Sequence, residues 1–150
     1  MPKPILHFAI FFVSIISLNA QFLSLSTQAE LDAWGTGRTE ISSGEVVTIR
    51  GNDITNIDAL SGLTSIEGTL FISSNGALTN IDGLSGLTSI VGRLSIEGNN
   101  ALTNIDALSG LTSIVGLLEI RSNNALTNIC LLYTSPSPRD RTRSRMPSSA

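Results

Sequence analysis

The sequence has little of the chemistry on which most enzymes depend. It contains one histidine, His7, and one cysteine, Cys130, and these lie near the two ends of the chain. The segment between them therefore cannot form Ser-His-Asp or Cys-His catalytic arrangements, or zinc sites made from histidine or cysteine. Disulfides within it are excluded as well. We expect no enzymatic activity, no cofactor and no metal site.

Positive charge is also scarce. Residues 21–129 contain no lysine, and their four arginines against eleven Asp and Glu give a net charge of −7, compared with −3 for the whole chain. A mildly acidic surface does not attract DNA or anionic lipid over long range. We therefore expect no nucleic-acid partner.

Residues 1–20 are interpreted as a secretory signal peptide. Lys3 is followed by an apolar run of about 14 residues, from Ile5 to Leu18, which is too short to cross a hydrocarbon core of ~30 Å as a helix. A retained membrane anchor is the alternative. Once the signal is removed, no membrane span is expected, and the protein is predicted to be secreted or held at the cell surface.

Residues 130–150 differ from the rest of the chain. They hold four of the nine basic residues and three of the five prolines. An arginine run of this kind would ordinarily suggest a basic arm. However, the peptide Cys130–Asp140, and again Ser144–Ala150, resembles a translated sequencing-library adapter. We interpret this tail as non-native, with the natural sequence continuing past Ile129.

The segment 47–129 is a repeat with a period of 24 residues. Identical residues recur at this interval, including Gly62, Gly86 and Gly110, Ile66, Ile90 and Ile114, and Leu70, Leu94 and Leu118. Within a unit, apolar residues fall every three positions from Leu78 to Ile90, and then two apart at Leu94 and Ile96. Period two predicts a strand with one buried face, and period three a 3₁₀-like or extended coil. Stacked units are predicted to form a parallel sheet along one side of a mainly β solenoid.

Residues 21–46 are predicted to form an N-terminal cap. Ser26 or Thr27 could N-cap a short helix over Gln28–Trp34. Its apolar residues Leu31 and Trp34 would cover the first unit, as a terminal element of a repeat protein must. At the other end, the repeat stops at Ile129, so the last unit is expected to expose an apolar edge.

Several columns of repeated residues are assigned to the fold. Glycines two residues before each strand are expected where φ is positive or the next unit approaches closely: Gly68, Gly92 and Gly116. Asparagines three residues after each strand are expected to turn the chain and satisfy inward-facing backbone groups: Asn75, Asn99 and Asn123. Ligand contact is the alternative for both columns.

Aspartate and threonine also recur in columns. We expect the aspartates to cap the following short turn, with a calcium ladder or carboxylate catalysis as alternatives: Asp58, Asp82 and Asp106. The threonines suit exposed strand positions, with ice binding as the alternative: Thr55, Thr79, Thr103 and Thr127, and Thr64, Thr88 and Thr112.

The repeat resembles known families. The motif Ile66–Ile72, recurring as Ile90–Ile96, is similar to the repeats of receptor L domains. The Leu-Thr-Asn-Ile and Leu-Ser-Gly-Leu-Thr-Ser-Ile segments are similar to bacterial leucine-rich surface repeats of the internalin kind. The resemblance implies a right-handed leucine-rich-like β-solenoid. Capping cysteines of animal receptor L domains are lacking, and the signal and near-identical repeats look more like a secreted protein of the Bacteroidetes type, in which a C-terminal sorting domain often follows.

Outward strand positions vary between units in an otherwise strict repeat, and they are the candidate ligand-binding residues: Thr69, Phe71, Arg93, Ser95, Leu117 and Glu119. Variation of this kind suits a recognition surface, but also solvent positions under no constraint. The leading hypothesis is a recognition or adhesion module that binds an extracellular protein or glycan. The alternative is the repeat region of a larger exported enzyme or adhesin whose active and sorting domains are missing.

Overall fold

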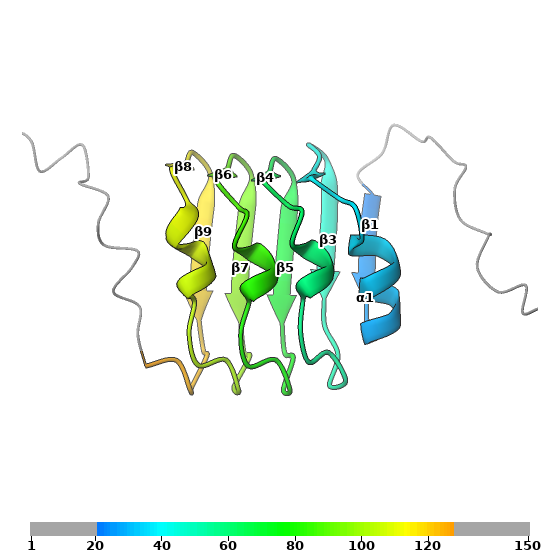
Figure 1. Cartoon of the computed structure of the whole chain (residues 1–150), viewed down its shortest axis with the longest axis vertical. Helices are drawn as coiled ribbons and strands as arrows, with labels where there is room; N and C mark the ends of the chain where they lie inside the picture. Colours follow the sequence, from blue (N-terminus) through cyan, green and yellow to red (C-terminus); the bar gives the residue numbers. More distant parts are fainter. Residues whose placement is uncertain (1–20, 128–150) are drawn as a thin grey trace, which may run out of the picture.

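The computed structural model describes residues 21–127, which form two parallel sheets, one α-helix and three 3₁₀ helices (Figure 1). The predicted signal peptide and adapter-like tail lie outside the described residues. The larger sheet has the strand order β1 (Gln21–Leu25), β3 (Glu45–Ile49), β5 (Thr69–Ser73), β7 (Arg93–Glu97) and β9 (Leu117–Arg121). The smaller sheet has the order β2 (Glu40–Ile41), β4 (Ser65–Ile66), β6 (Ser89–Ile90) and β8 (Ser113–Ile114).

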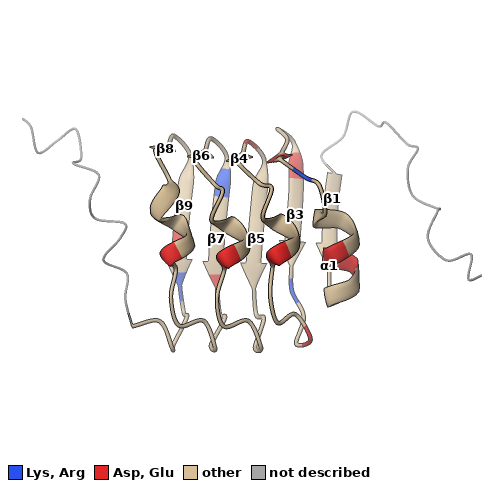
Figure 2. Cartoon of the chain, viewed as in Figure 1, with Lys and Arg blue, Asp and Glu red and all other residues tan. Residues whose placement is uncertain are grey.

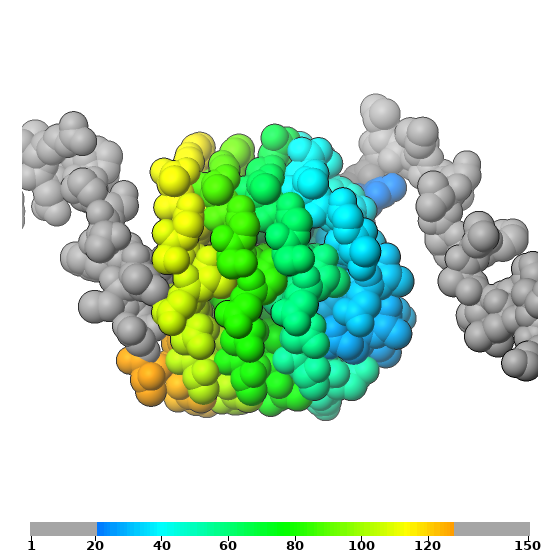
Figure 3. All heavy atoms as spheres, viewed as in Figure 1, coloured from blue at the N-terminus to red at the C-terminus, as the bar shows by residue number. Residues whose placement is uncertain are grey.

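Successive units lie side by side, as the bands of colour in Figure 3 show. Paired residues in neighbouring strands are 24 positions apart in the sequence, since Leu70 pairs with Leu94 and Leu94 with Leu118. Between β3 and β5 the interval is 23, with Val47 opposite Leu70. The connection after β3 is one residue shorter than its later counterparts, so it absorbs the difference and the inward strand residues stay aligned.

The core lies between the larger sheet and a row of 3₁₀ helices, η1 (Asp58–Leu60), η2 (Asp82–Leu84) and η3 (Asp106–Gly110). The apolar residues at period three are fully buried, as are the two inward residues of the adjoining strand: Leu78, Ile81, Leu84, Leu87, Ile90, Leu94 and Ile96. The predicted strand and 3₁₀-like turn are therefore confirmed. In a 3₁₀ or extended backbone every third side chain faces the same way, which places this row of residues against the strands.

The smaller sheet was not predicted. Its strands are only two residues long, and they fall in the Thr-Ser-Ile segment at the end of the period-three run. Ser65 and Ile66 pair with Ser89 and Ile90 of the next unit. A ladder this short is decided by the neighbouring unit rather than by a local pattern, so the period-two signal is missing.

The segment predicted as a cap supplies the helix and also extends both sheets. Helix α1 (Gln28–Gly35) takes the place of a 3₁₀ helix beside η1, and its Leu31 is fully buried, while Trp34 packs at the edge of the core. Strands β1 and β2 belong to the larger and smaller sheet respectively, and neither was predicted. The cap is thus a modified first unit with an α-helix instead of a 3₁₀ turn.

A capping box fixes the start of α1. The Thr27 Oγ1 accepts the Glu30 N–H at 3.2 Å, and the Glu30 carboxylate accepts the Thr27 N–H at 3.2 Å and the Ser26 N–H at 2.8 Å. Of the two predicted caps, Thr27 is the one used. The Ser26 hydrogen bonds, followed by those of Thr27, lower the pKa of Glu30, because they favour the charged carboxylate.

Removing this cap is expected to weaken the N-terminal end. Thr27→Ala should lower the free energy of unfolding by about 1 kcal/mol, since the Glu30 N–H loses its acceptor in the first helical turn. Chemical denaturation followed by circular dichroism would measure the change. Thr27→Ser keeps the oxygen and should lose much less, and an equal loss in both variants would contradict the capping role.

The other end of the structure exposes apolar side chains. Ile114 is 47% exposed, whereas its counterparts Ile66 and Ile90 are fully buried, and Leu117 is 49% exposed. Within residues 21–127 no strand lies beyond β9 or β8 in either sheet. The expected apolar edge is therefore present at the last described unit. No helix in the described part is long and apolar enough to span a bilayer.

Candidate recognition surface

The six candidate binding residues form two neighbouring columns on the outer face of the larger sheet. Strand register places Thr69, Arg93 and Leu117 in one column, and Phe71, Ser95 and Glu119 in the other. Side chains alternate along a strand, so these positions point away from the buried leucines and isoleucines between them. The structure thus brings all six residues together on one face.

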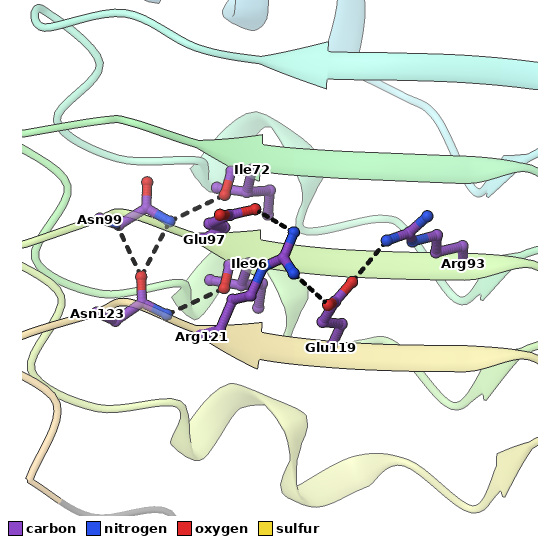
Figure 4. A network of polar contacts seen from close by, with 8 residues as sticks. All are labelled: Ile72, Arg93, Ile96, Glu97, Asn99, Glu119, Arg121 and Asn123. Carbon is purple, nitrogen blue, oxygen red and sulfur yellow. Dashed lines mark hydrogen bonds and ion pairs between the residues drawn. The ribbon is translucent and has the colours of Figure 1, made fainter.

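A network of polar contacts links these columns across β7 and β9 (Figure 4). Arg93 forms an ion pair with Glu119. Arg121 pairs with Glu119 at 2.9 Å and with Glu97 at 2.8 Å. Glu97 and Arg121 were not among the predicted site residues, although the same alternation places them in a third outward column. Exposed pairs of this kind contribute little individually, but here four side chains hold one another in fixed positions.

The arginines on this face are held by more than one contact. The Arg93 guanidinium lies over the Phe71 ring, 5.2 Å from its centroid. Its Nε is buried and has no hydrogen-bond partner among the described residues. The hydrogen bond to Glu97, followed by the charges of Glu119 and Glu97, raises the pKa of Arg121. Both arginines are therefore oriented by their neighbours.

Ser95 is the exception among the candidates. It lies between Phe71 and Glu119 in its column and is only 2% exposed. Both neighbours in the column have larger side chains, and Ser95 does not form part of the accessible surface. The sequence pattern could place Ser95 on the outer face but could not reveal that it is buried there.

Charge is distributed unevenly around the molecule (Figure 2). Outward positions in and directly after the larger sheet's strands carry three arginines and two glutamates: Arg50, Arg93, Arg121, Glu97 and Glu119. This gives the outer face a net charge of +1, and the rest of residues 21–127 therefore carries −8. The remaining acidic residues include the aspartate at the start of each 3₁₀ helix, seen as a red row in Figure 2. The outer face thus differs in sign from the remainder.

Asparagines form a buried ladder at the end of the larger sheet. Asn99 Nδ2 donates to the Ile72 carbonyl at 2.9 Å (Figure 4). Asn99 Oδ1 accepts the Asn75 N–H at 3.0 Å. Asn123 repeats this pattern one unit later, and Asn75 one unit earlier, where the Gly51 N–H is the donor. These side chains satisfy inward-facing backbone groups, and Asn75 and Asn99 are fully buried. This arrangement favours a structural role over ligand contact.

The glycine column lies where neighbouring units come closest. A Cβ on Gly92 would lie 1.9 Å from the Gly68 carbonyl oxygen, and one on Gly116 would lie 1.8 Å from that of Gly92. None of the three glycines has a positive φ. Of the two predicted reasons for glycine, close approach is therefore the one that applies, and the positive φ is wrong.

The aspartate column does not cap the 3₁₀ helices through its side chains. Asp58, Asp82 and Asp106 are the first residues of these helices, and no side-chain cap precedes them. Instead, the asparagine two residues earlier accepts the aspartate N–H, as Asn80 does for Asp82 at 3.1 Å. The prediction of an aspartate cap is wrong, because the N-cap position is an isoleucine, the aspartate is already the first helical residue, and no side-chain cap hydrogen bond is present. Within residues 21–127 no group of three or more potential ligands could hold a metal ion.

The threonine columns are also tied to the backbone. The Thr88 Oγ1 donates to the Thr64 carbonyl at 3.1 Å, and the Thr112 Oγ1 donates to the Thr88 carbonyl at 3.1 Å. Each of these hydroxyls therefore bridges two units, which gives threonine a structural reason to recur there. None of the threonines in either column lies in a strand, so the expectation of strand positions is wrong. Ice binding stays an untested alternative.

Comparison of the chain with protein-family models, with curated proteins and with solved structures found no match. The resemblance to receptor L domains and internalin-like repeats therefore stays a prediction.

Proposed function

We propose that this chain is a secreted or cell-surface recognition module without catalytic activity. Its scaffold is a right-handed leucine-rich-like β-solenoid of the receptor L-domain or internalin kind, and it contacts an extracellular protein or glycan through the outer face of the larger sheet. The parallel register of both sheets at 24-residue steps supports the solenoid. The signal-like residues 1–20 support export.

The contrast between the two sheets carries the proposal. On the smaller sheet three of the four strands repeat the same residues, Thr-Ser-Ile, at Thr64, Thr88 and Thr112 and the positions after them, and β2 differs by Glu40. On the larger sheet the outward residues change completely from unit to unit, and they combine an aromatic ring, arginines and glutamates. Tyrosine, phenylalanine and arginine are enriched at interfaces, where acidic residues are depleted. A face with net charge +1 on an otherwise acidic body therefore suits contact with a partner.

The second candidate is the repeat region of a larger exported enzyme or adhesin. The apolar edge at β9 favours it, since a further part of a protein could cover Ile114 and Leu117 there. In that case the active and sorting domains lie outside this sequence.

Binding assays on the full chain would test the proposed face. A glycan array and capture of extracellular proteins would identify a ligand, and Phe71→Ser is then expected to weaken its binding about tenfold, as loss of a central aromatic contact does. Val91→Ser is the control, because Val91 is an exposed apolar residue that follows β6 of the smaller sheet, whereas Phe71 is a half-buried residue of the larger sheet.

If Val91→Ser weakens binding as much as Phe71→Ser, or if only Val91→Ser weakens it, the outer face of the larger sheet is not the contact surface. Absence of any ligand for the full chain would favour the second candidate.

A further inference from the structure

The buried ladder contains a pair of residues with a reactivity of its own. Asn75 is followed by Gly76, and this Asn-Gly pair occurs once in the sequence. An asparagine loses its amide when the backbone nitrogen of the next residue attacks Cγ, expels ammonia and closes a succinimide ring, which water then opens to aspartate or isoaspartate. The attack is fastest before glycine, because no Cβ shields the nitrogen. The ladder residues Asn99 and Asn123 are each followed by a second asparagine instead.

The folded protein holds the Asn75 side chain away from this attack. The side chain is fully buried. Its Oδ1 accepts the Gly51 N–H at 2.9 Å, and its Nδ2 donates to the Ile49 carbonyl at 3.1 Å and to Asn99 Oδ1 at 3.0 Å. The amide is thus bound to the units on both sides, and turning Cγ toward the Gly76 nitrogen would break all three hydrogen bonds.

Neither product of the reaction fits the ladder. In aspartate an acceptor oxygen replaces Nδ2, so it would face two other acceptors, the Ile49 carbonyl and Asn99 Oδ1. A carboxylate that is buried without a donor for one of its oxygens is strongly unfavourable. Isoaspartate carries the backbone through the former side chain, which adds a carbon between β5 and the following turn and shifts the later residues relative to the adjoining units.

We propose that Asn75–Gly76 is a modification site that is unreactive in the folded protein and makes prolonged unfolding permanent. Deamidation occurs when Asn75 leaves the ladder, and its products cannot pair there again. The rate in the folded state then follows the fraction of molecules that are open, which is ~10⁻³–10⁻⁶ for ordinary proteins. This inference does not depend on the proposed function, because it concerns the lifetime of the fold rather than a contact surface.

Incubation of the full chain with and without guanidinium chloride, at the same mildly alkaline pH, would test the site. Digestion after arginine gives the fragments 51–93 and 94–121. The mass gain from replacing NH₂ by OH should appear in the first fragment, at Asn75, and at least ~1000-fold more slowly in the folded sample. The second fragment is the internal control, because it has asparagines but no Asn-Gly pair. Isomerisation at Asp82–Gly83 leaves the mass unchanged and is therefore not confused with deamidation.

Refolding after increasing times in denaturant would test the consequence for the fold. The yield of folded chain after dilution, measured by circular dichroism, should fall in step with the deamidated fraction. Gly76→Ala should deamidate several-fold more slowly in denaturant and keep its refolding yield, because its methyl group shields the nitrogen and meets no close neighbour in the fold. Asn75→Asp carries the side chain of one product and should not recover the native signal even when freshly prepared.

Three outcomes would overturn the proposal. The folded chain could be modified at Asn75 as fast as the denatured chain, or Gly76→Ala could react in denaturant as fast as the unmodified chain. In the third outcome, deamidated chain separated by ion exchange refolds to the stability of the unmodified chain. A refolding yield that falls equally in Gly76→Ala would assign the loss to aggregation and would also reject the proposed consequence.

Discussion

Gly92→Val is expected to leave little folded protein. The new Cβ would lie 1.9 Å from the Gly68 carbonyl oxygen and 2.4 Å from that of Glu67, and both are backbone atoms that cannot rotate away. Relief requires β7 and β5 to separate, which breaks hydrogen bonds and opens the core between two units. A loss of about 3 kcal/mol or more in the free energy of unfolding is expected. Urea denaturation followed by circular dichroism would measure it.

Gly76→Ala is the matched control for this variant. A Cβ there would have Asn52 Oδ1, at 3.8 Å, as its nearest neighbour, which is an ordinary contact. The φ of Gly76 is not positive, so alanine should be tolerated and could raise stability by up to about 1 kcal/mol through the unfolded state. If both variants unfold alike, close approach is not the reason for glycine in the column.

Asn99→Leu should destabilise the protein although the side chains are similar in size. The Ile72 carbonyl loses its donor at 2.9 Å, and the Asn75 N–H loses its acceptor at 3.0 Å, both in a fully buried position. Two buried backbone groups without partners are expected to cost about 2–5 kcal/mol together. Thermal and chemical denaturation would show the change.

Its neighbour Asn100 provides the control, because Asn100 is exposed. Asn100→Ala should change the free energy of unfolding by no more than about 0.5 kcal/mol. Equal effects at the two positions would mean that the ladder hydrogen bonds do not stabilise the fold. Asn99→Asp is a further check, since a carboxylate cannot donate to the Ile72 carbonyl and should also destabilise.

Much of the scaffold could be predicted because its apolar residues recur at short, regular intervals along the sequence. Leucine and isoleucine at steps of three and two predicted the 3₁₀-like or extended turn and the strand of each unit, and Ser26 or Thr27 was predicted as the start of the helix. These patterns act within a few residues, so a single sequence displays them. The six outward candidates followed from the same alternation.

What could not be predicted depends on contacts between units. Strand β1 lies in a segment without a repeat signature, and it pairs only because β3 offers an open edge. The ion pairs of Arg121 with Glu97 and Glu119 need the register of two strands 24 residues apart. The burial of Ser95 needs the strands on both sides of it. No local pattern carries this information.

The pairing of β5 with β7 is equivalent to the pairing of β7 with β9, and this has a consequence for how such a chain can change length during evolution. Residues 24 apart make the same contacts on either side of β7, so duplication or loss of a whole unit between the first and last would return every glycine, asparagine and leucine to an equivalent neighbour. Each such event would lengthen or shorten the molecule by one strand spacing, about 4.8 Å. A difference of one residue is accommodated in the loop after β3, where the strand interval is 23. The reach of the protein can therefore vary in discrete steps while its cross-section stays constant.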